Sequence, residues 1–274
     1  MTETRDRIVQ DALTLARELA GRAMAAMRSD DPLEITTKAD PGDFVTDIDR
    51  QIERATREAV LERFPDHSFH GEEYGDRPGV DWAWYCDPVD GTTNFSVGLG
   101  WHSFSLALND ADGPVVGVVA DPRSGEVFSA VRGQGAWLND APLRPTPPTD
   151  PTGTVLLTEL LSTAPWPGMA TFLDTMHEQF VTTRIMGSSA LSIANVAAGR
   201  GHTAIIGHYG AVDLMAAVLV AAEAGLEVVD ETGAMNLFPA GGGILVTSPG
   251  IREAMFGWWT AARGATETRA GRGV

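Results

Sequence analysis

The stretch CDPVDGTTNF, residues 86–95, places two acids three positions apart at the end of a short apolar run. A proline lies between the acids, so Asp87, Asp90 and the Val89 carbonyl can face one point. Gly91 lets the backbone pass close to a ligand, because glycine has no Cβ. A tight Asp-Gly turn accounts for Asp90 and Gly91, but it leaves the other acid and the threonines unexplained. The stretch therefore predicts a ligand site at the end of a strand.

Further carboxylates fall at the ends of predicted elements. Asp49 in FVTDIDR begins a predicted helix, and Asp213 begins the most apolar helix of the chain. Glu72 and Glu73 lie in the predicted turn HGEEYG. Taken singly, Asp49 reads as a helix cap and the two glutamates as a solvated turn. A carboxylate that opens an apolar helix, however, must cap the helix, pair with another group or bind a cation.

Oxygen atoms dominate these candidate ligands, which favours a hard divalent cation, with Mg²⁺ as the first choice. The six histidines form no HExxH-like pair, and the sequence has no His/Cys cluster with zinc spacing. If a helix starts at residues 91–93, its free backbone N–H groups form an anion site beside the metals. Metal ions next to a helix N-terminus describe a place for a phosphate.

The composition is that of a folded globular protein with an acidic surface. Of the 274 residues 43% are hydrophobic and 21% charged, and 37 acidic against 20 basic residues give a formal net charge of −17. Such a surface repels nucleic-acid phosphates and anionic membranes, so we expect neither as a partner. A phosphate substrate then requires bound cations that reverse the local field. The single cysteine and the lack of a signal-peptide core or a bilayer-spanning run favour a cytoplasmic enzyme.

The elements that must position the acids fall into two halves. In the first half, the apolar periodicity predicts helices within 1–27 and at 47–64, a strand at 82–85 and antiparallel strands between 103 and 137. In the second half, it predicts strands at 154–158, 181–186, 203–206, 226–229 and 243–247, and helices at 168–179, 188–198, 211–224 and from 249 onward. Mixed elements of this kind predict an α+β or α/β layered sandwich.

A Pro- and Thr-rich connector at 143–153 is the best candidate boundary between the halves. We therefore expect an N-terminal α+β subdomain, residues 1–145, that carries most of the metal ligands. We expect a C-terminal α/β subdomain, residues 146–274, that carries Asp213 and the wall facing the substrate.

The sequence resembles the inositol monophosphatase family of Mg²⁺-dependent, lithium-sensitive phosphomonoesterases over most of its length. The resemblance rests on GEE, on DPVDGTTNF and on the aspartate of AVDLMAA with AAEAG behind it. RGQGAWLND and RIMGSSALSIANVAAGR are similar to further family segments. The resemblance implies a layered αβαβα sandwich of the sugar-phosphatase type, a homodimer and two to three Mg²⁺ ions per site. It also implies hydrolysis of a small phosphate monoester, an inositol, cyclitol or sugar phosphate, by a metal-activated water.

The resemblance assigns a role to each matching residue. The implied metal ligands are Glu72, Asp87, the Val89 carbonyl, Asp90 and Asp213. The residues implied to orient and activate the attacking water are Asp49, Glu72 and Thr92. The implied phosphate-binding residues are Gly91, Thr92 and Thr93, with Lys38 and Glu73 in supporting roles.

The segment expected to face the substrate departs from the pattern of the inositol-specific members. Those members have a glutamate seven residues before the last aspartate ligand and a tryptophan directly before it, where this chain has Ile206 and Val212. Isoleucine cannot accept a hydrogen bond from a cyclitol hydroxyl. Our hypothesis is therefore that inositol monophosphate is not the best substrate. The expected substrate contacts are Ser188, Ser189, Ile206, His208 and Asp213, with Tyr209 as a further candidate.

Several substrates and one other class of function stay open. Related families with the same core hydrolyse 3′-phosphoadenosine 5′-phosphate, fructose 1,6-bisphosphate or histidinol phosphate, and residue types alone do not separate them. A nucleotide substrate would need aromatic or basic side chains near the pocket, and the sequence shows no clear set of them. Histidinol phosphate would need an acidic side chain to pair with its amine, and Ile206 does not supply one. The alternative class is a non-catalytic relative that binds a metabolite, against which the complete set of ligands counts.

Overall fold

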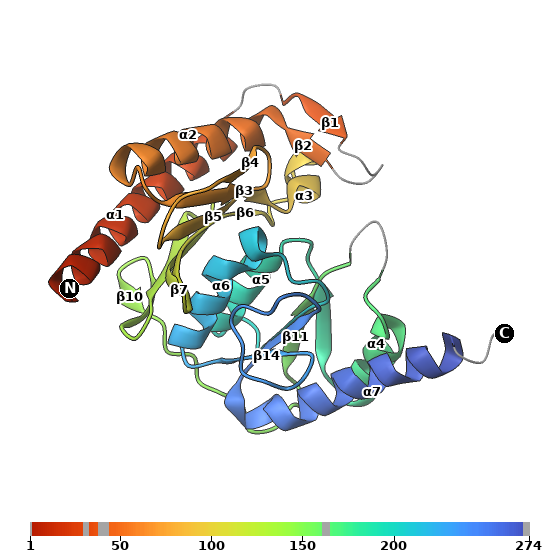
Figure 1. Cartoon of the computed structure of the whole chain (residues 1–274). Helices are drawn as coiled ribbons and strands as arrows, with labels where there is room; N and C mark the ends of the chain where they lie inside the picture. Colours follow the sequence, from red (N-terminus) through yellow and green to blue (C-terminus); the bar gives the residue numbers. More distant parts are fainter. Residues whose placement is uncertain (1, 30–32, 38–43, 161–164, 271–274) are drawn as a thin grey trace.

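The computed structural model describes residues 2–29, 33–37, 44–160 and 165–270, which form five stacked layers (Figure 1). Two sheets alternate with three helical layers. The helical layers are α1 (Thr2–Met27) with α2 (Asp47–Arg63), then α5 (Ser189–Ala197) with α6 (Ala211–Glu223), then α4 (Met169–Glu178) with α7 (Arg252–Ala270). The predicted layered αβαβα sandwich is confirmed.

The first sheet has eight strands in the order β10-β9-β8-β7-β6-β5-β3-β4. Its strands are β3 (Ser68–Gly71), β4 (Gly75–Arg77), β5 (Ala83–Asp90), β6 (Ser103–Asp110), β7 (Gly113–Asp121), β8 (Glu126–Val131), β9 (Gly135–Leu138) and β10 (Ala141–Pro142). All neighbours in it are antiparallel except β3 and β5. The antiparallel strands predicted between 103 and 137 are present. A separate antiparallel pair of strands, β1 (Ile35–Thr37) and β2 (Phe44–Thr46), precedes α2.

Strand β5 does not end where the apolar run ends. The sequence predicted a strand at 82–85 followed by a turn, whereas β5 continues to Asp90 with a register shift between Asp87 and Asp90. Pro88 has no N–H for the ladder, and the Val89 N–H donates to the Asp87 carboxylate at 3.0 Å instead. The irregular strand end then leads through Gly91 into the short helix α3 (Thr92–Ser96).

The second sheet has five strands in the order β12-β11-β13-β15-β14. They are β11 (Val155–Thr158), β12 (Thr182–Ile185), β13 (Thr203–Ile206), β14 (Glu227–Asp230) and β15 (Ile244–Thr247). Strand β11 is parallel to both of its neighbours, and β15 is antiparallel to β13 and β14. A short 3-10 helix, η1 (Pro249–Ile251), leads into α7. The proposed subdomain boundary at 145/146 lies between the last strand of the first sheet and the first strand of the second.

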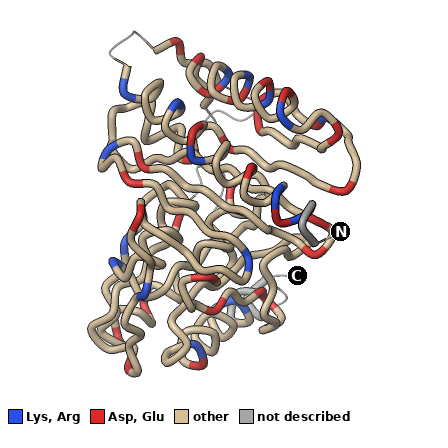
Figure 2. The backbone as a smooth tube through the Cα atoms, turned by 90° about the vertical axis from the view of Figure 1, so that its left-hand side faces the viewer, with Lys and Arg blue, Asp and Glu red and all other residues tan. Residues whose placement is uncertain are grey.

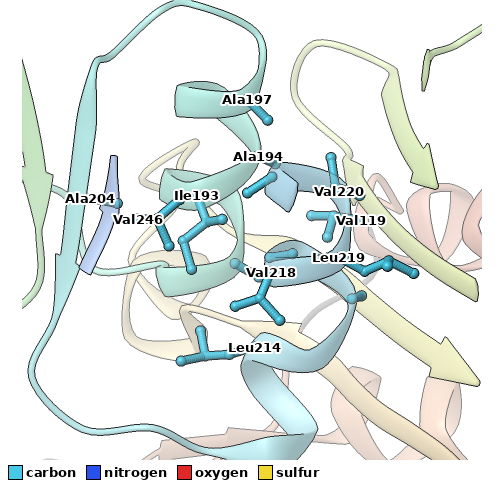
Figure 3. Packing of buried hydrophobic residues seen from close by; sticks show 14 of the residues in the cluster. Val119, Ile193, Ala194, Ala197, Ala204, Leu214, Val218, Leu219, Val220 and Val246 are labelled. Carbon is cyan, nitrogen blue, oxygen red and sulfur yellow. The ribbon is translucent and has the colours of Figure 1, made fainter. Parts of the chain in front are cut away.

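The middle layer joins the two sheets through one apolar core. All residues of α5 and all of α6 from Leu214 to Ala221 are buried, between Val119 of the first sheet and Val246 of the second (Figure 3). Helix α6 packs closely on β7, because a Cβ at Gly117 would lie 2.6 Å from the Ala216 carbonyl oxygen. Burial of each large aliphatic side chain here contributes about 1.5–3 kcal/mol. The core therefore fixes the helix whose first turn carries Asp213.

Charged residues lie along the whole chain rather than in one basic face (Figure 2). On the outer helices some of them pair at the surface, as Arg22 does with Glu18 and Arg63 with Asp11. Exposed pairs of this kind contribute little to stability. None of the described helices combines the length and the apolar character that crossing a membrane requires.

Candidate active site

Asp49 and Thr92, which the sequence placed in two different segments, lie in contact. Asp49 is fully buried and is the third residue of α2, where it forms a capping box with Thr46. One carboxylate oxygen accepts from the Thr46 backbone at 3.0 Å and from the Thr46 hydroxyl. The other oxygen lies 3.1 Å from the Thr92 hydroxyl, which also lies 2.9 Å from the Val89 carbonyl. Asp49 is therefore both a helix cap and a partner of Thr92.

The environment of Asp49 favours its protonated form more than water does. Burial raises the pKa of the Asp49 carboxyl, and the nearby Glu72 carboxylate raises it further. Hydrogen bonds from Thr46 and Thr92 act in the opposite direction. The net effect raises the pKa above its ordinary value, toward the range in which a carboxylate accepts a proton near neutral pH.

Asp87 is the centre of a cluster of like charges. Its side chain is buried, and burial raises the pKa of the Asp87 carboxyl well above its ordinary value. The carboxylates of Glu72, Asp213 and Asp90, in that order, raise the pKa further, and a hydrogen bond with Glu72 acts in the same direction. All these influences oppose ionisation of Asp87, so a cation at this place would relieve them. Glu72, Asp90 and Asp213 therefore lie near enough to Asp87 to act on its charge.

Asp90 joins the first sheet to the N-terminus of α5. Its two oxygens accept from the backbone N–H groups of Ser189 at 3.1 Å and Ala190 at 2.8 Å. The oxygen that accepts from Ala190 also accepts from the hydroxyls of Ser103, at 3.2 Å, and Ser188. Burial raises the pKa of Asp90, while these hydrogen bonds lower it. Ser188, predicted to contact the substrate, is 1% exposed and directs its hydroxyl to Asp90 instead.

The backbone conformation at position 91 and a close contact within the chain both require glycine, and its approach to a ligand stays a prediction. Its φ is +91°, and a Cβ there would lie 2.9 Å from the Gly187 carbonyl oxygen. The close approach is therefore to the segment before α5. Asn94, whose role the sequence did not predict, also binds the segment before α5. Its side-chain amide donates to the Met186 carbonyl at 2.7 Å and to the Trp101 carbonyl at 2.8 Å.

Asp213 lies in the first turn of α6, as predicted, and its side chain folds back over the start of the helix. A Cβ at Gly210, the N-cap residue, would clash with the Asp213 carboxylate, so a larger residue there would displace this side chain. The Ser105 hydroxyl donates to the Asp213 carbonyl at 3.0 Å and ties the helix to β6. The apolar helix thus opens on a carboxylate that faces the acids of the first half.

Glu53 positions the turn that carries Glu72 and Glu73, and sequence analysis missed it. It is fully buried and accepts from the backbone N–H groups of Glu73 at 2.5 Å and Tyr74 at 2.9 Å. A Cβ at Gly71 would clash with the Glu53 carboxylate, so the turn packs closely against this side chain. The available signal was an acid on the apolar face of α2, one turn after Asp49.

The predicted substrate wall is only partly exposed. Ile206 is 1% exposed and belongs to the central core. Tyr209 is buried as well, and its hydroxyl donates to the Leu237 carbonyl at 3.0 Å. His208, by contrast, is exposed.

The other predicted contacts differ in their surroundings. The Ser189 hydroxyl donates to Glu159, a buried acid that sequence analysis missed. Thr93 is exposed, and Lys38 lies outside the described residues.

The residues present fit a hard divalent cation by their chemistry. Four carboxylates and one peptide carbonyl make an oxygen-only donor set, and the leading influences on Asp87 all disfavour its charge. Within the described ranges, no three His, Cys, Asp or Glu side chains already form a ready-made group for an ion. These residues therefore suit a divalent cation through their oxygen donors and their negative charge.

Comparison with known proteins supports one family. The model of the inositol monophosphatase family matches residues 5–265. The chain is 36% identical to Nus factor SuhB of Pasteurella multocida, over 84% of this chain and 87% of that protein, and 33% identical to Nus factor SuhB of Escherichia coli K12, over 89% and 92%.

Solved structures agree with this assignment. The extragenic suppressor protein SuhB from Bartonella henselae aligns with a TM-score of 0.83 at 28% identity, over 90% of this chain and 98% of that chain. The IMPase from Thermotoga maritima aligns with a TM-score of 0.83 at 27% identity, over 93% and 99%. The chain belongs to the inositol monophosphatase family.

Proposed function

We propose that this protein hydrolyses a small phosphate monoester, a cyclitol or sugar phosphate, with the help of Mg²⁺. The observation that carries the proposal is the gathering of Glu72, Asp87, Asp90 and Asp213 around a buried, like-charged centre. Such a centre is costly without a counter-charge, so its presence is best explained by cations.

The residues proposed to hold the cations are the four acids together with the Val89 carbonyl. Mg²⁺ bound there would lower the pKa of a water molecule and stabilise the charge that develops on the leaving oxygen. The acids themselves would fix where a phosphate can lie, because the cations would offset the repulsion between a phosphate and a chain of net charge −17. The backbone contacts to phosphate from Gly91, Thr92 and Thr93 stay a prediction.

Asp49 and Thr92 are proposed to orient a water molecule and accept its proton. The Thr92 hydroxyl can donate to Asp49, which leaves an oxygen lone pair to accept from water. The raised pKa of Asp49 makes its carboxylate a better proton acceptor than an ordinary aspartate. Both residues lie at the starts of helices anchored in the first subdomain, which keeps the pair in place.

A second candidate comes from the name of the curated relatives, Nus factor SuhB. A role as a factor of that kind needs no turnover, and it corresponds to the non-catalytic alternative. It also means that the expected absence of a nucleic-acid partner stays a prediction. Homodimer assembly and lithium sensitivity, which the family resemblance implies, stay predictions as well.

Phosphate release from a panel of phosphate monoesters, with Mg²⁺ and with EDTA, tests the proposal. The panel holds inositol 1-phosphate, fructose 1,6-bisphosphate, 3′-phosphoadenosine 5′-phosphate, histidinol phosphate and several sugar phosphates. We expect release that needs Mg²⁺ and is greatest for a sugar or cyclitol phosphate other than inositol 1-phosphate. No release from any compound would favour the non-catalytic candidate.

A further inference from the structure

Glu159 lies at the end of β11, beside the position where the predicted substrate wall lacks an acid. Thr158 pairs with Ile205 in parallel register, so the next residues, Glu159 and Ile206, lie side by side at the ends of neighbouring strands. The Ile206 side chain is part of the core and offers no hydrogen-bonding atom. Glu159 therefore brings a carboxylate to the same end of the sheet from one strand away.

The Glu159 carboxylate holds two segments of the wall together. One oxygen accepts from the Ser189 hydroxyl at the first residue of α5. The other accepts from the Gly207 N–H at 3.2 Å, and the His208 backbone donates to the same carboxylate. Glu159 is 7% exposed, so these contacts, rather than solvent, satisfy it.

This arrangement determines what Ser189 can offer to a ligand. A serine hydroxyl has one proton and two acceptor lone pairs. Because the proton is directed to Glu159, the Ser189 oxygen can only accept a hydrogen bond from a further partner. Ser189 is 9% exposed, more than Ser188 at 1%, whose hydroxyl is held by Asp90 on the other side of the helix start. The wall thus presents an acceptor directly beside a predicted metal ligand.

We propose that the Glu159–Ser189 pair selects leaving groups that carry a hydroxyl near the phosphate. Ser189 accepts a hydrogen bond from that hydroxyl. Glu159 is the positioning residue, because it takes the Ser189 proton and so leaves the Ser189 oxygen as an acceptor. This inference rests on the proposed function and deepens it, because it names the chemical group that the site recognises. A polyol, cyclitol or sugar phosphate donates such a hydrogen bond. A phosphate ester of the same skeleton without the hydroxyl leaves the Ser189 acceptor unpaired.

The test compares glycerol 2-phosphate with isopropyl phosphate, which has the same carbon skeleton and no hydroxyl. We expect the wild type to prefer glycerol 2-phosphate in kcat/KM. Ser189→Ala and Glu159→Gln should each reduce this preference by about five- to twenty-fold, mainly through the KM for glycerol 2-phosphate. The double variant should lose no more than either single variant, because both act through one contact.

Glu178→Gln is the matched control, since Glu178 is exposed at the end of α4 and its side chain makes no hydrogen bond or ion pair with the residues that the structure describes. Two results would overturn the inference alone: a wild type that releases phosphate from both compounds without preference, or variants that keep the preference as the control does. If Glu159→Gln does not fold, the substrate preference of Ser189→Ala alone tests the inference. A wild type that releases phosphate from neither these compounds nor the panel would overturn the proposed function instead.

Discussion

At the scale of single residues, most side chains of the site have two tasks. Asp49 caps α2 with one oxygen and meets Thr92 with the other, and Asp90 holds the start of α5 while it belongs to the acid cluster. The capping explanation of Asp49 and the catalytic one are therefore compatible. A substitution at such a residue changes local structure as well as chemistry, so the informative variants are those that remove one task only.

Thr92→Ala removes the hydroxyl that faces Asp49 and leaves the helix cap intact. We expect kcat for the best substrate to fall by about 10²-fold or more, because a positioned proton acceptor contributes on that order. The Mg²⁺ dependence of the rate should stay the same, since no predicted ligand side chain is lost. Thr14→Ala, an exposed change on α1, is the control. A Thr92→Ala rate within two-fold of that control would exclude this residue from the reaction.

At the scale of elements, the site consists of the starts of helices and the end of one irregular strand. The sequence predicted the helix starts well, because caps, apolar periodicity and acids mark them locally. It did not predict that β5 continues to Asp90, since the distortion depends on how Asp87 folds back on its own backbone. Glu53 and Glu159 were missed because their roles come from distant backbone N–H groups that no local pattern reveals.

Glu53 gives the turn of β3 and β4 a pH-dependent stability. Burial raises its pKa above the ordinary value of 4.5, so folding disfavours its ionised form. Its contribution to the free energy of unfolding should therefore fall as the pH rises from about 4.5 through the raised pKa. Glu53→Gln cannot ionise, so its stability should fall less than that of the wild type over the same range. Urea unfolding in EDTA at pH 4.5 and 8 measures both; equal falls would contradict the assignment.

At the scale of the whole molecule, the middle layer packs against both sheets and so joins the two predicted subdomains. The predicted boundary at 145/146 separates the sheets along the chain, but one apolar core contains residues of both sheets and of α5 and α6. Helix α6 is buried between the sheets (Figure 3), and Asp213 in its first turn acts on the charge of Asp87 in the first sheet. The sequence predicted the two halves, and the shared core follows from packing that spans them.

Leu219→Ala tests this shared core. Leu219 is fully buried in α6, so its truncation should lower the free energy of unfolding by about 2–5 kcal/mol. Hydrogen exchange in β7 and in β13 should be accelerated to the same extent, because the two sheets would open together. Exchange that increases in only one of the two sheets would indicate independently folding subdomains, and the boundary would then also be a thermodynamic one.

The central claim is that the acid cluster around Asp87 holds the Mg²⁺ that hydrolysis requires. The most direct measurement is phosphate release by the wild type and by Asp87→Asn over one series of Mg²⁺ concentrations, on the best substrate of the panel. We predict that the wild-type rate rises to saturation and vanishes in EDTA, and that Asp87→Asn stays folded but loses at least about 10²-fold in rate. A wild-type rate that is independent of Mg²⁺, or an Asp87→Asn variant with the full rate, would contradict the claim.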